Sequence, residues 1–321
     1  MMLRLLSHDL PRNRLLALAL VLIVLALALA PLLFPGSKAL GVAAKMLIFI
    51  LLVASYDLLL GYTGIVSFAH TMFFGIGAYG VAIASSKLGP GFASVGIGLV
   101  LALVASLLLS LLIGLFSLRV KAIFFAMITL AVASAFQTLA SQLSEFTGGE
   151  DGLTFKNPQW LSPSFEWSQM LGLPWELDGR HLTYWLLFVA VAVTFLCLLR
   201  VVNSPFGRVL QAIRENDFRA EAIGYRLVVY RTLSNVISAA VATLAGALLA
   251  LWLRYTGPDT TLSFEIMLDI LLIDVIGRVL FALAQNHLQD LLKLTAGAVE
   301  GVPVLAAALT PDRPIGFEYQ G

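Results

Sequence analysis

Long apolar stretches with few charged residues recur along most of the chain. A helix needs roughly 20 mostly apolar residues to cross the hydrocarbon core of a bilayer, which is about 30 Å thick. Stretches that meet this condition occupy residues 15–34, 41–60, 66–86, 92–116, 121–141, 183–202, 232–254 and 264–285. Because they are rich in Leu and Ala and are continuous rather than alternating, they favour helices over barrel strands. The sequence therefore predicts an all-α fold, a polytopic transmembrane helical bundle of about eight spans, with residues 1–321 forming a single domain.

Composition excludes soluble and disordered proteins. Hydrophobic residues make up 60% of the 321 residues and charged residues 12%, whereas soluble domains have about 45–50% and about 25%. A soluble fold of this length could not bury so much apolar surface, and disordered chains are polar and charged. The single cysteine, Cys197, excludes an internal disulfide.

Basic residues predict the orientation of the bundle, because cytoplasmic loops of membrane proteins are enriched in Lys and Arg. Arginines precede the first apolar stretch, and more of them lie in the loop 203–231, whereas the loop 142–182 is acidic. This pattern predicts a cytoplasmic N-terminus, a cytoplasmic loop at 203–231 and an extracytoplasmic loop at 142–182. The first stretch is too long for a signal-peptide core and is interpreted as a retained span.

Motifs typical of enzymes and nucleotide-binding proteins are missing from the sequence. It has no G-x-x-x-x-G-K-[ST] loop and no G-x-S-x-G motif, and its four histidines lack metal-site spacing. Gly75, Gly77 and Gly80 do form G-x-G-x-x-G, but inside an apolar stretch, where small residues let helices pack closely. We therefore expect these glycines to serve helix packing. For the chain as a whole we expect no catalytic residue and no bound metal or cofactor.

The connection between the second and third apolar stretches contains two glycines and several hydroxyl side chains. Non-helical backbone at membrane depth is tolerated only where protein or a water-filled cavity covers it. Two interpretations are open: a segment beside a translocation path, or a short interfacial turn. The residues concerned are Gly61, Thr63, Gly64, Ser67 and His70. The nearby Asp57 would be costly facing lipid, so we expect it near the cytoplasmic end or facing the bundle interior.

The loop 203–231 mixes basic, acidic and apolar residues. Ser204 and Pro205 are typical of a helix start, and Gly224 is typical of a helix end. These signals predict a short amphipathic helix pair. Its imperfect apolar stripe consists of Leu210, Ile213, Phe218 and Ala222. A segment resting on anionic lipid would be more purely basic, so the mixed charges favour a protein groove as the binding partner.

Several of these segments, taken together, resemble one family. The pattern GYTG-x-x-S-x-x-H is followed by FFGIGAY, and later by SPFGR-x-L-x-AIREN, AEA-x-G and SAAVATLAGAL. From about residue 40 to Gly277 the chain resembles branched-chain amino acid permeases of the LivM type. Residues Ala220 to Gly224 resemble the cytoplasmic EAA-type loop of ATP-binding-cassette importer permeases.

The resemblance implies a permease subunit of an importer for branched-chain or related amino acids, not an enzyme, in the bacterial inner membrane. Implied partners are two ATPase subunits that bind the ATP, a second permease subunit of the LivH type, a periplasmic substrate-binding protein and the lipid bilayer, but no nucleic acid. Residues 203–231 would be the coupling loop that docks on the ATPase. Its implied docking residues are Arg208, Ala212, Arg214, Glu215, Asn216, Glu221, Ala222 and Gly224.

The chain departs from the family pattern after Gly277, where a glycine-rich connection and a final span are expected. The sequence therefore predicts an internal deletion and an irregular tail over residues 286–321. Acidic residues also stand in the last apolar stretch, at Glu265, Asp269 and Asp274, and Arg278 could pair with Asp274 one turn away. Two alternatives follow: an ion-coupled secondary transporter that uses acids such as Asp269, or a truncated subunit that does not transport.

Overall fold

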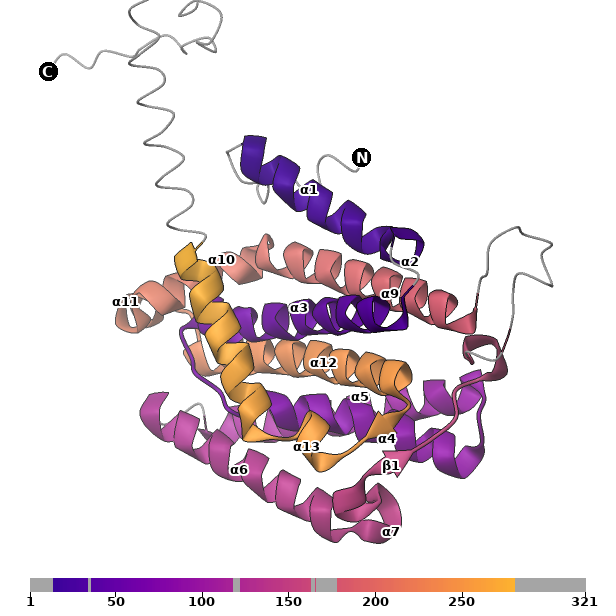
Figure 1. Cartoon of the computed structure of the whole chain (residues 1–321). Coiled ribbons are helices and arrows are strands. Elements are labelled where there is room, and N and C mark those ends of the chain that lie inside the picture. Colours follow the sequence, from indigo (N-terminus) through magenta and orange to yellow (C-terminus); the bar gives the residue numbers. More distant parts are fainter. Residues whose placement is uncertain (1–13, 34–35, 118–121, 163–164, 166–177, 281–321) are drawn as a thin grey trace, which may run out of the picture.

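The structure, a computed structural model, describes residues 14–33, 36–117, 122–162, 165 and 178–280. The described chain is a bundle of long helices with short elements at its ends (Figure 1). The long helices are α3 (Ser37–Thr63), α4 (His70–Leu88), α5 (Phe92–Ser117), α6 (Ala122–Gln142), α9 (Gly179–Val202), α12 (Leu227–Leu253) and a helix over residues 264–280. The predicted tail 286–321 lies outside the described residues, whereas the site of the predicted deletion, directly after Gly277, lies within the helix over residues 264–280.

Five of the described helices, α3, α5, α6, α9 and α12, are long and apolar enough to cross a bilayer. The prediction of an all-α, polytopic helical bundle is confirmed. Helix α4 is shorter, and most of its side chains are buried among the other helices. The number of spans and the cytoplasmic N-terminus stay predictions.

We expected the first apolar stretch, residues 15–34, to form one continuous span, but it does not. It divides into α1 (Arg14–Ala28) and α2 (Ala30–Leu33), with a turn at Leu29. Pro31 explains the break, because it has no backbone N–H to donate to the carbonyl of Leu27 four residues earlier. The hydroxyl of Tyr184 donates to that carbonyl instead, at 2.7 Å, and so connects α1 to α9.

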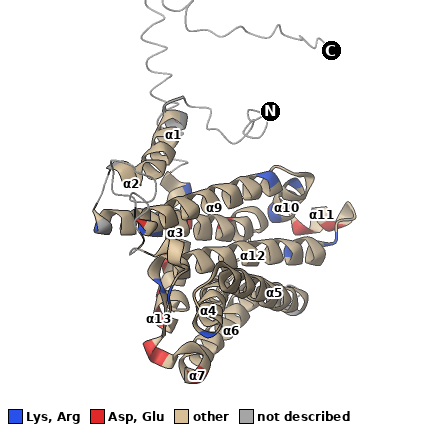
Figure 2. Ribbon diagram, turned by 90° about the vertical axis from the view of Figure 1, so that its right-hand side faces the viewer, with Lys and Arg blue, Asp and Glu red and all other residues tan. Residues whose placement is uncertain are grey.

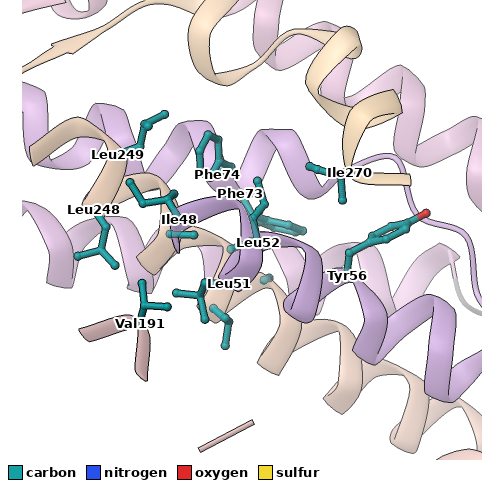
Figure 3. Close-up of a cluster of buried hydrophobic side chains, with 14 of the residues drawn as sticks. Ile48, Leu51, Leu52, Tyr56, Phe73, Phe74, Val191, Leu248, Leu249 and Ile270 are labelled. Carbon is teal, nitrogen blue, oxygen red and sulfur yellow. The ribbon is translucent and has the colours of Figure 1, made fainter. Parts of the chain in front are cut away.

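Helix α12 lies at the centre of the bundle and packs against α3, α4 and α5. Its Leu248 and Leu249 join a buried cluster with Ile48 and Leu52 of α3 and Phe73 of α4 (Figure 3).

The boundaries that we predicted for two helices differ from those in the structure. Helix α12 begins at Leu227, so the loop expected over 203–231 ends at residue 226, and α4 begins at His70 rather than at residue 66.

Glycines let α4 and α12 approach to backbone contact. A Cβ atom at Gly77 would overlap the carbonyl of Thr243, and one at Gly246 would overlap the carbonyl of Phe74. Gly80 lies in the same way against Gly98 of α5. The interpretation of G-x-G-x-x-G as a helix-packing motif is therefore confirmed.

Short elements cover the end of the bundle opposite α10 and α11 (Figure 1). They are α7 (Ser144–Thr147), the 3₁₀ turns η2 (Gly149–Asp151) and η3 (Gln159–Leu161), α13 (Pro258–Thr261) and the strands β1 (Leu153–Thr154) and β2 (Tyr255–Thr256). The strands pair antiparallel, with Leu153 opposite Thr256. The side-chain amide of Asn157 donates to the carbonyl of Leu251 at 2.7 Å, so the segment after α6 is held against the end of α12.

We predict that Gly246→Ala destabilises the protein by about 1–3 kcal/mol, because the new methyl group forces α12 away from the backbone of α4. The matched control is Gly96→Ala in α5, where an added Cβ meets no atom within 4 Å. There the better helix propensity of Ala should raise stability by up to about 1 kcal/mol. Thermal unfolding in detergent measures both, and equal shifts would contradict the packing role of Gly246.

Candidate functional site

Two segments that we identified in the sequence meet at one end of the bundle. They are the connection between α3 and α4 and the loop that follows α9. Helix α3 continues through Gly61 and Thr63, so the break expected from Gly61 onward begins only at Gly64. Gly64 adopts a left-handed conformation with φ of 69°, and its N–H donates to the carbonyl of Leu59. Residues 64–69 then run without helical structure to the start of α4.

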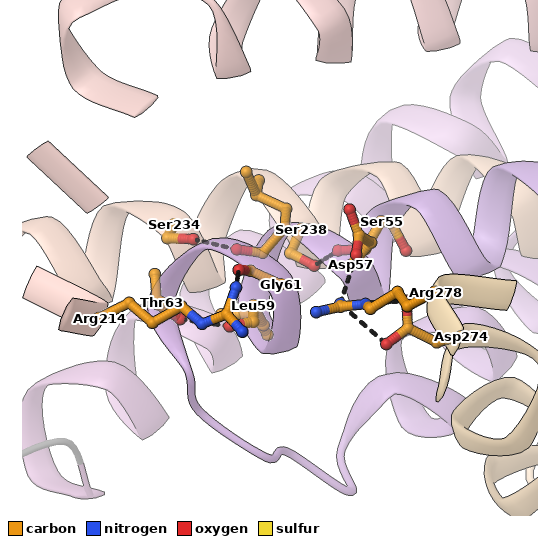
Figure 4. Close-up of polar contacts among 11 residues, drawn as sticks. Ser55, Asp57, Leu59, Gly61, Thr63, Arg214, Ser234, Ser238, Asp274 and Arg278 are labelled. Carbon is orange, nitrogen blue, oxygen red and sulfur yellow. Dashed lines mark hydrogen bonds and ion pairs between the residues drawn. The ribbon is translucent and has the colours of Figure 1, made fainter. Parts of the chain in front are cut away.

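Arg214 connects the loop after α9 to this helix end. It lies at the end of α10 (Pro205–Glu215), and its guanidinium donates to the carbonyl of Gly61 in the last turn of α3 (Figure 4). A Cβ atom at Gly64 would come within 3.2 Å of the Arg214 Cγ, so the arginine stem lies over this glycine. A cation is favourable here, because the last carbonyls of a helix lack helical partners and carry partial negative charge.

Helices α10 and α11 (Asp217–Ala222) form the predicted amphipathic pair. Leu210 and Ile213 are buried under α10, as predicted. Phe218 and Ala222 are exposed, so their place in the predicted apolar stripe is wrong. The helix ends after residue 215 and restarts in a new direction, which breaks the periodicity, and Ala220 is the buried residue of α11.

Side-chain contacts cap α11 and attach it to α12. The Asn216 side chain accepts a hydrogen bond from the N–H of Arg219 at 2.9 Å and so caps α11. Asp217 pairs with Arg231 of α12 at 2.6 Å. Gly224, with φ of 102°, lets the chain turn after α11 toward α12. The backbone starts α10 at Ser204 and Pro205 as predicted, but the Ser204 hydroxyl donates to the carbonyl of Val201 instead of capping the helix.

The residues predicted to form the docking surface lie on α10, on α11 or in the turns beside them, and all are exposed. Figure 2 shows charged residues gathered on α10 and α11 while most of each long helix is uncharged. The residues are Arg208, Ala212, Arg214, Glu215, Asn216, Glu221, Ala222 and Gly224. The fold therefore presents a compact surface of mixed charge beyond the end of the bundle.

His70 and Ser67 lie deeper and are fully buried. Nε2 of His70 lies 2.9 Å from the hydroxyl of Ser238, which itself donates to the carbonyl of Ser55 (Figure 4). The ring of Tyr56 packs edge-on against the imidazole, with centroids 5.0 Å apart. Protein thus covers most of the non-helical connection over residues 64–69, although Gly64 is exposed. Thr63 bonds within its own helix, to the carbonyl of Leu59.

Helix α12 carries a row of buried polar side chains that we did not predict from the sequence. Asn235 donates to the carbonyl of Ser110, at 2.9 Å, and the hydroxyls of Thr243 and Ser106 lie 2.6 Å apart. These bonds join α12 to α5, while Ser234 and Ser238 join it to α3. The sequence does contain a signal for these interhelical hydrogen bonds, because Ser, Asn and Thr recur at helical spacing within one apolar stretch.

An ion-pair cluster holds the helix over residues 264–280 against α3. Arg278 pairs with Asp274 at 2.8 Å, as predicted, and also with Asp57 of α3. Asp57 thus obtains the partner that its depth demands. Glu265 and Asp269 are exposed on the other face of this helix. Among the residues that the structure describes, no group of His, Cys, Asp and Glu side chains could hold a metal ion.

Comparisons with known proteins identify the family that this sequence matches. The family described as "Branched-chain amino acid transport system / permease component" matches residues 38–302. The high-affinity branched-chain amino acid transport system permease protein LivM of Salmonella typhimurium is 26% identical over 248 residues, which cover 74% of this chain and 57% of the relative. A probable LivM permease of Methanocaldococcus jannaschii is 30% identical over 200 residues, 59% of this chain and 54% of the relative.

The matched region thus spans little more than half the length of these curated relatives. No solved structure matches the chain significantly. The family match covers most of the residues, including all of the long helices from α4 to α12 and both segments that meet at Arg214. This chain belongs to the family of permease components of branched-chain amino acid transport systems.

Proposed function

We propose that this chain is a membrane-spanning permease subunit of an ATP-binding-cassette importer and translocates branched-chain or related amino acids. Family membership supports the transport role. ATP would bind to separate ATPase chains, and this chain would bind no cofactor of its own. The other partners would be a second permease subunit of the LivH type and a periplasmic substrate-binding protein, and the complex would lie in the bacterial inner membrane.

The observation that carries this proposal is the attachment of α10 and α11 to three long helices. Helix α10 follows α9 after a short turn, Arg214 contacts the end of α3, and Asp217 pairs with Arg231 of α12. A force applied to the helix pair would therefore reach the ends of all three helices together. Packed helices move as near-rigid bodies in such transitions, so ATPase closure could be transmitted to the bundle.

The surface of the helix pair suits a protein groove. Phe218 is 83% exposed and Ile223 is 72% exposed. They lie beside Glu215, Arg219 and Glu221, which are also exposed. Aromatic residues are enriched at protein interfaces, whose rims are polar, whereas a surface for anionic lipid would be mainly basic.

We expect Phe218→Ala to weaken binding of the ATPase about tenfold or more, the loss typical of a buried aromatic hot spot. The measurement is co-purification with the candidate ATPase subunits, followed by affinity titration. Phe146→Ala is the matched control, because Phe146 is also exposed but lies in α7 at the opposite end of the bundle. A double variant, Glu221→Arg with Gly224→Asp, should also lose the ATPase. Full retention by Phe218→Ala and by the double variant would contradict docking at α11.

We expect Arg214→Ala to lower amino acid uptake severalfold, because α10 is no longer attached to the end of α3. It should weaken ATPase binding less than Phe218→Ala does, because the Arg214 guanidinium contacts the carbonyl of Gly61 within the chain. Arg200→Ala is the control and should transport nearly normally, because Arg200 is an exposed arginine in the last turn of α9 that is not among the predicted docking residues. Radiolabelled leucine uptake into cells or vesicles with the partner subunits measures this. Uptake that survives ATP depletion but collapses with an uncoupler would identify an ion-coupled transporter instead. Normal insertion without uptake under any energy source would identify a non-transporting subunit.

A further inference from the structure

Charged side chains from three helices meet at Gly61, close to the end of α3 (Figure 4). A Cβ atom at Gly61 would overlap both the carboxylate of Asp57 and the guanidinium of Arg278. Asp57 and Gly61 are one helical turn apart on the same face of α3. Arg214 of α10 donates to the carbonyl of the same glycine, and its charge also acts on Asp57. One turn of α3 therefore carries contacts to α10 and to the helix over residues 264–280.

The charges of this cluster are balanced. It contains two carboxylates, Asp57 and Asp274, and two guanidiniums, Arg214 and Arg278. Asp274 has only 3% of its side chain exposed and pairs with Arg278 at 2.8 Å, whereas 37% of the Asp57 side chain is exposed. A buried charge that loses its partner is strongly destabilising. Removal of Asp57 leaves Asp274 paired with Arg278, so Asp57 can be replaced without leaving a buried charge unpaired.

The helix over residues 264–280 is attached to the bundle by apolar residues in its first half and by charged residues in its second half. Within this helix only Met267, Ile270 and Asp274 are buried. Met267 and Ile270 belong to the hydrophobic core, and no residue after Asp274 is buried. In a bilayer, apolar packing contributes little to helix association, because lipid is equally apolar. The second half therefore depends mainly on the ion pairs of Arg278 for its contact with α3.

This last helix also contacts the non-helical connection over residues 64–69. The ring of Phe264 packs against the ring of Phe68, with centroids 6.0 Å apart. The stem of Arg214 lies over Gly64, the first residue of the connection. Helix α10 thus contacts the beginning of the connection, and the last helix contacts its later part. Non-helical backbone at membrane depth has to stay covered by protein, so α3, α10 and the last helix have to move together.

We propose that Asp57 and Arg278 are positioning residues of the transport cycle. Their ion pair makes the helix over residues 264–280 move with α3 and α10 when the ATPase subunits act on the α10–α11 pair. This inference rests on the proposed function and adds a fourth helix to the three that the pair contacts. Without the ion pair the ATPase still hydrolyses ATP, but the movement stops at α3, and less amino acid is transported for each ATP.

The test uses the complex of this chain with the second permease subunit, the ATPase subunits and the binding protein, reconstituted in vesicles. Uptake of radiolabelled leucine and release of phosphate are measured on the same vesicles, which gives the leucine transported per ATP hydrolysed. Asp57→Ala should lower this ratio at least about fivefold, the lower end of the usual range for coupling between distant sites. A merely structural role would lower uptake and hydrolysis together and leave the ratio unchanged, which would overturn the proposal.

A second variant changes the geometry and keeps every charge. In Gly61→Ala the new methyl group forces the Asp57 carboxylate and the Arg278 guanidinium apart, and the ratio should fall as in Asp57→Ala. Both groups are the ends of flexible side chains, so the helices can keep their places while the pair separates. Gly41→Ala, in the same helix, is the matched control, because no atom lies within 4 Å of its added Cβ. Equal ratios for the two glycine variants would contradict the role of the ion pair.

The same measurements separate this inference from the proposed function. If the unmodified complex takes up leucine without ATP, or does not take it up at all, the proposed function is wrong and this inference fails with it. If the unmodified complex shows ATP-driven uptake and Asp57→Ala keeps the normal ratio, only the role of the Asp57–Arg278 pair is wrong.

Discussion

The backbone contact between α4 and α12 is the constraint on which the rest of this fold depends. In a bilayer, helices gain little from burying apolar side chains, because lipid is equally apolar, so they associate through close packing and interhelical hydrogen bonds. Gly77 and Gly246 allow the two backbones to touch. That contact places α12 at the centre, where α3 and α5 can pack on its remaining faces and bury Ser238, Asn235 and Thr243 in hydrogen bonds.

Polar contacts then attach the peripheral elements to this centre. Arg214 contacts the end of α3, the Asp57–Arg278 pair holds the helix over residues 264–280, and Tyr184 holds α1. Each contact involves a group that would be costly if left alone at membrane depth: a terminal helix carbonyl, a carboxylate, or the carbonyl exposed by Pro31. The requirement to satisfy these groups decides where each outer helix lies, because few partners are within reach.

Prediction from sequence was most successful where a local pattern carries the information. Apolar length predicted the long helices, and the glycine spacing at Gly77 and Gly80 predicted helix packing. Prediction failed where the chain changes direction, and where a contact joins residues far apart in the sequence. We predicted that the apolar stripe of the loop continues through Phe218, but Phe218 is exposed. The periodicity of the sequence could not reveal that one helix ends and a second begins, in a new direction, after Asn216. The break in the first stretch was also missed, although Pro31 signals it locally.

By itself the sequence determined that this chain is an all-helical membrane protein, that its mixed-charge loop forms a short helix pair, and that it resembles the permease family to which it belongs. These properties follow from composition and from short-range spacing. Only the tertiary structure decided that Arg214 meets Gly61, that His70 meets Ser238, and that Asp57 meets Arg278 across more than 200 residues. Such pairs depend on how helices far apart in sequence pack together, and no local pattern encodes which carbonyl or carboxylate a distant side chain will reach.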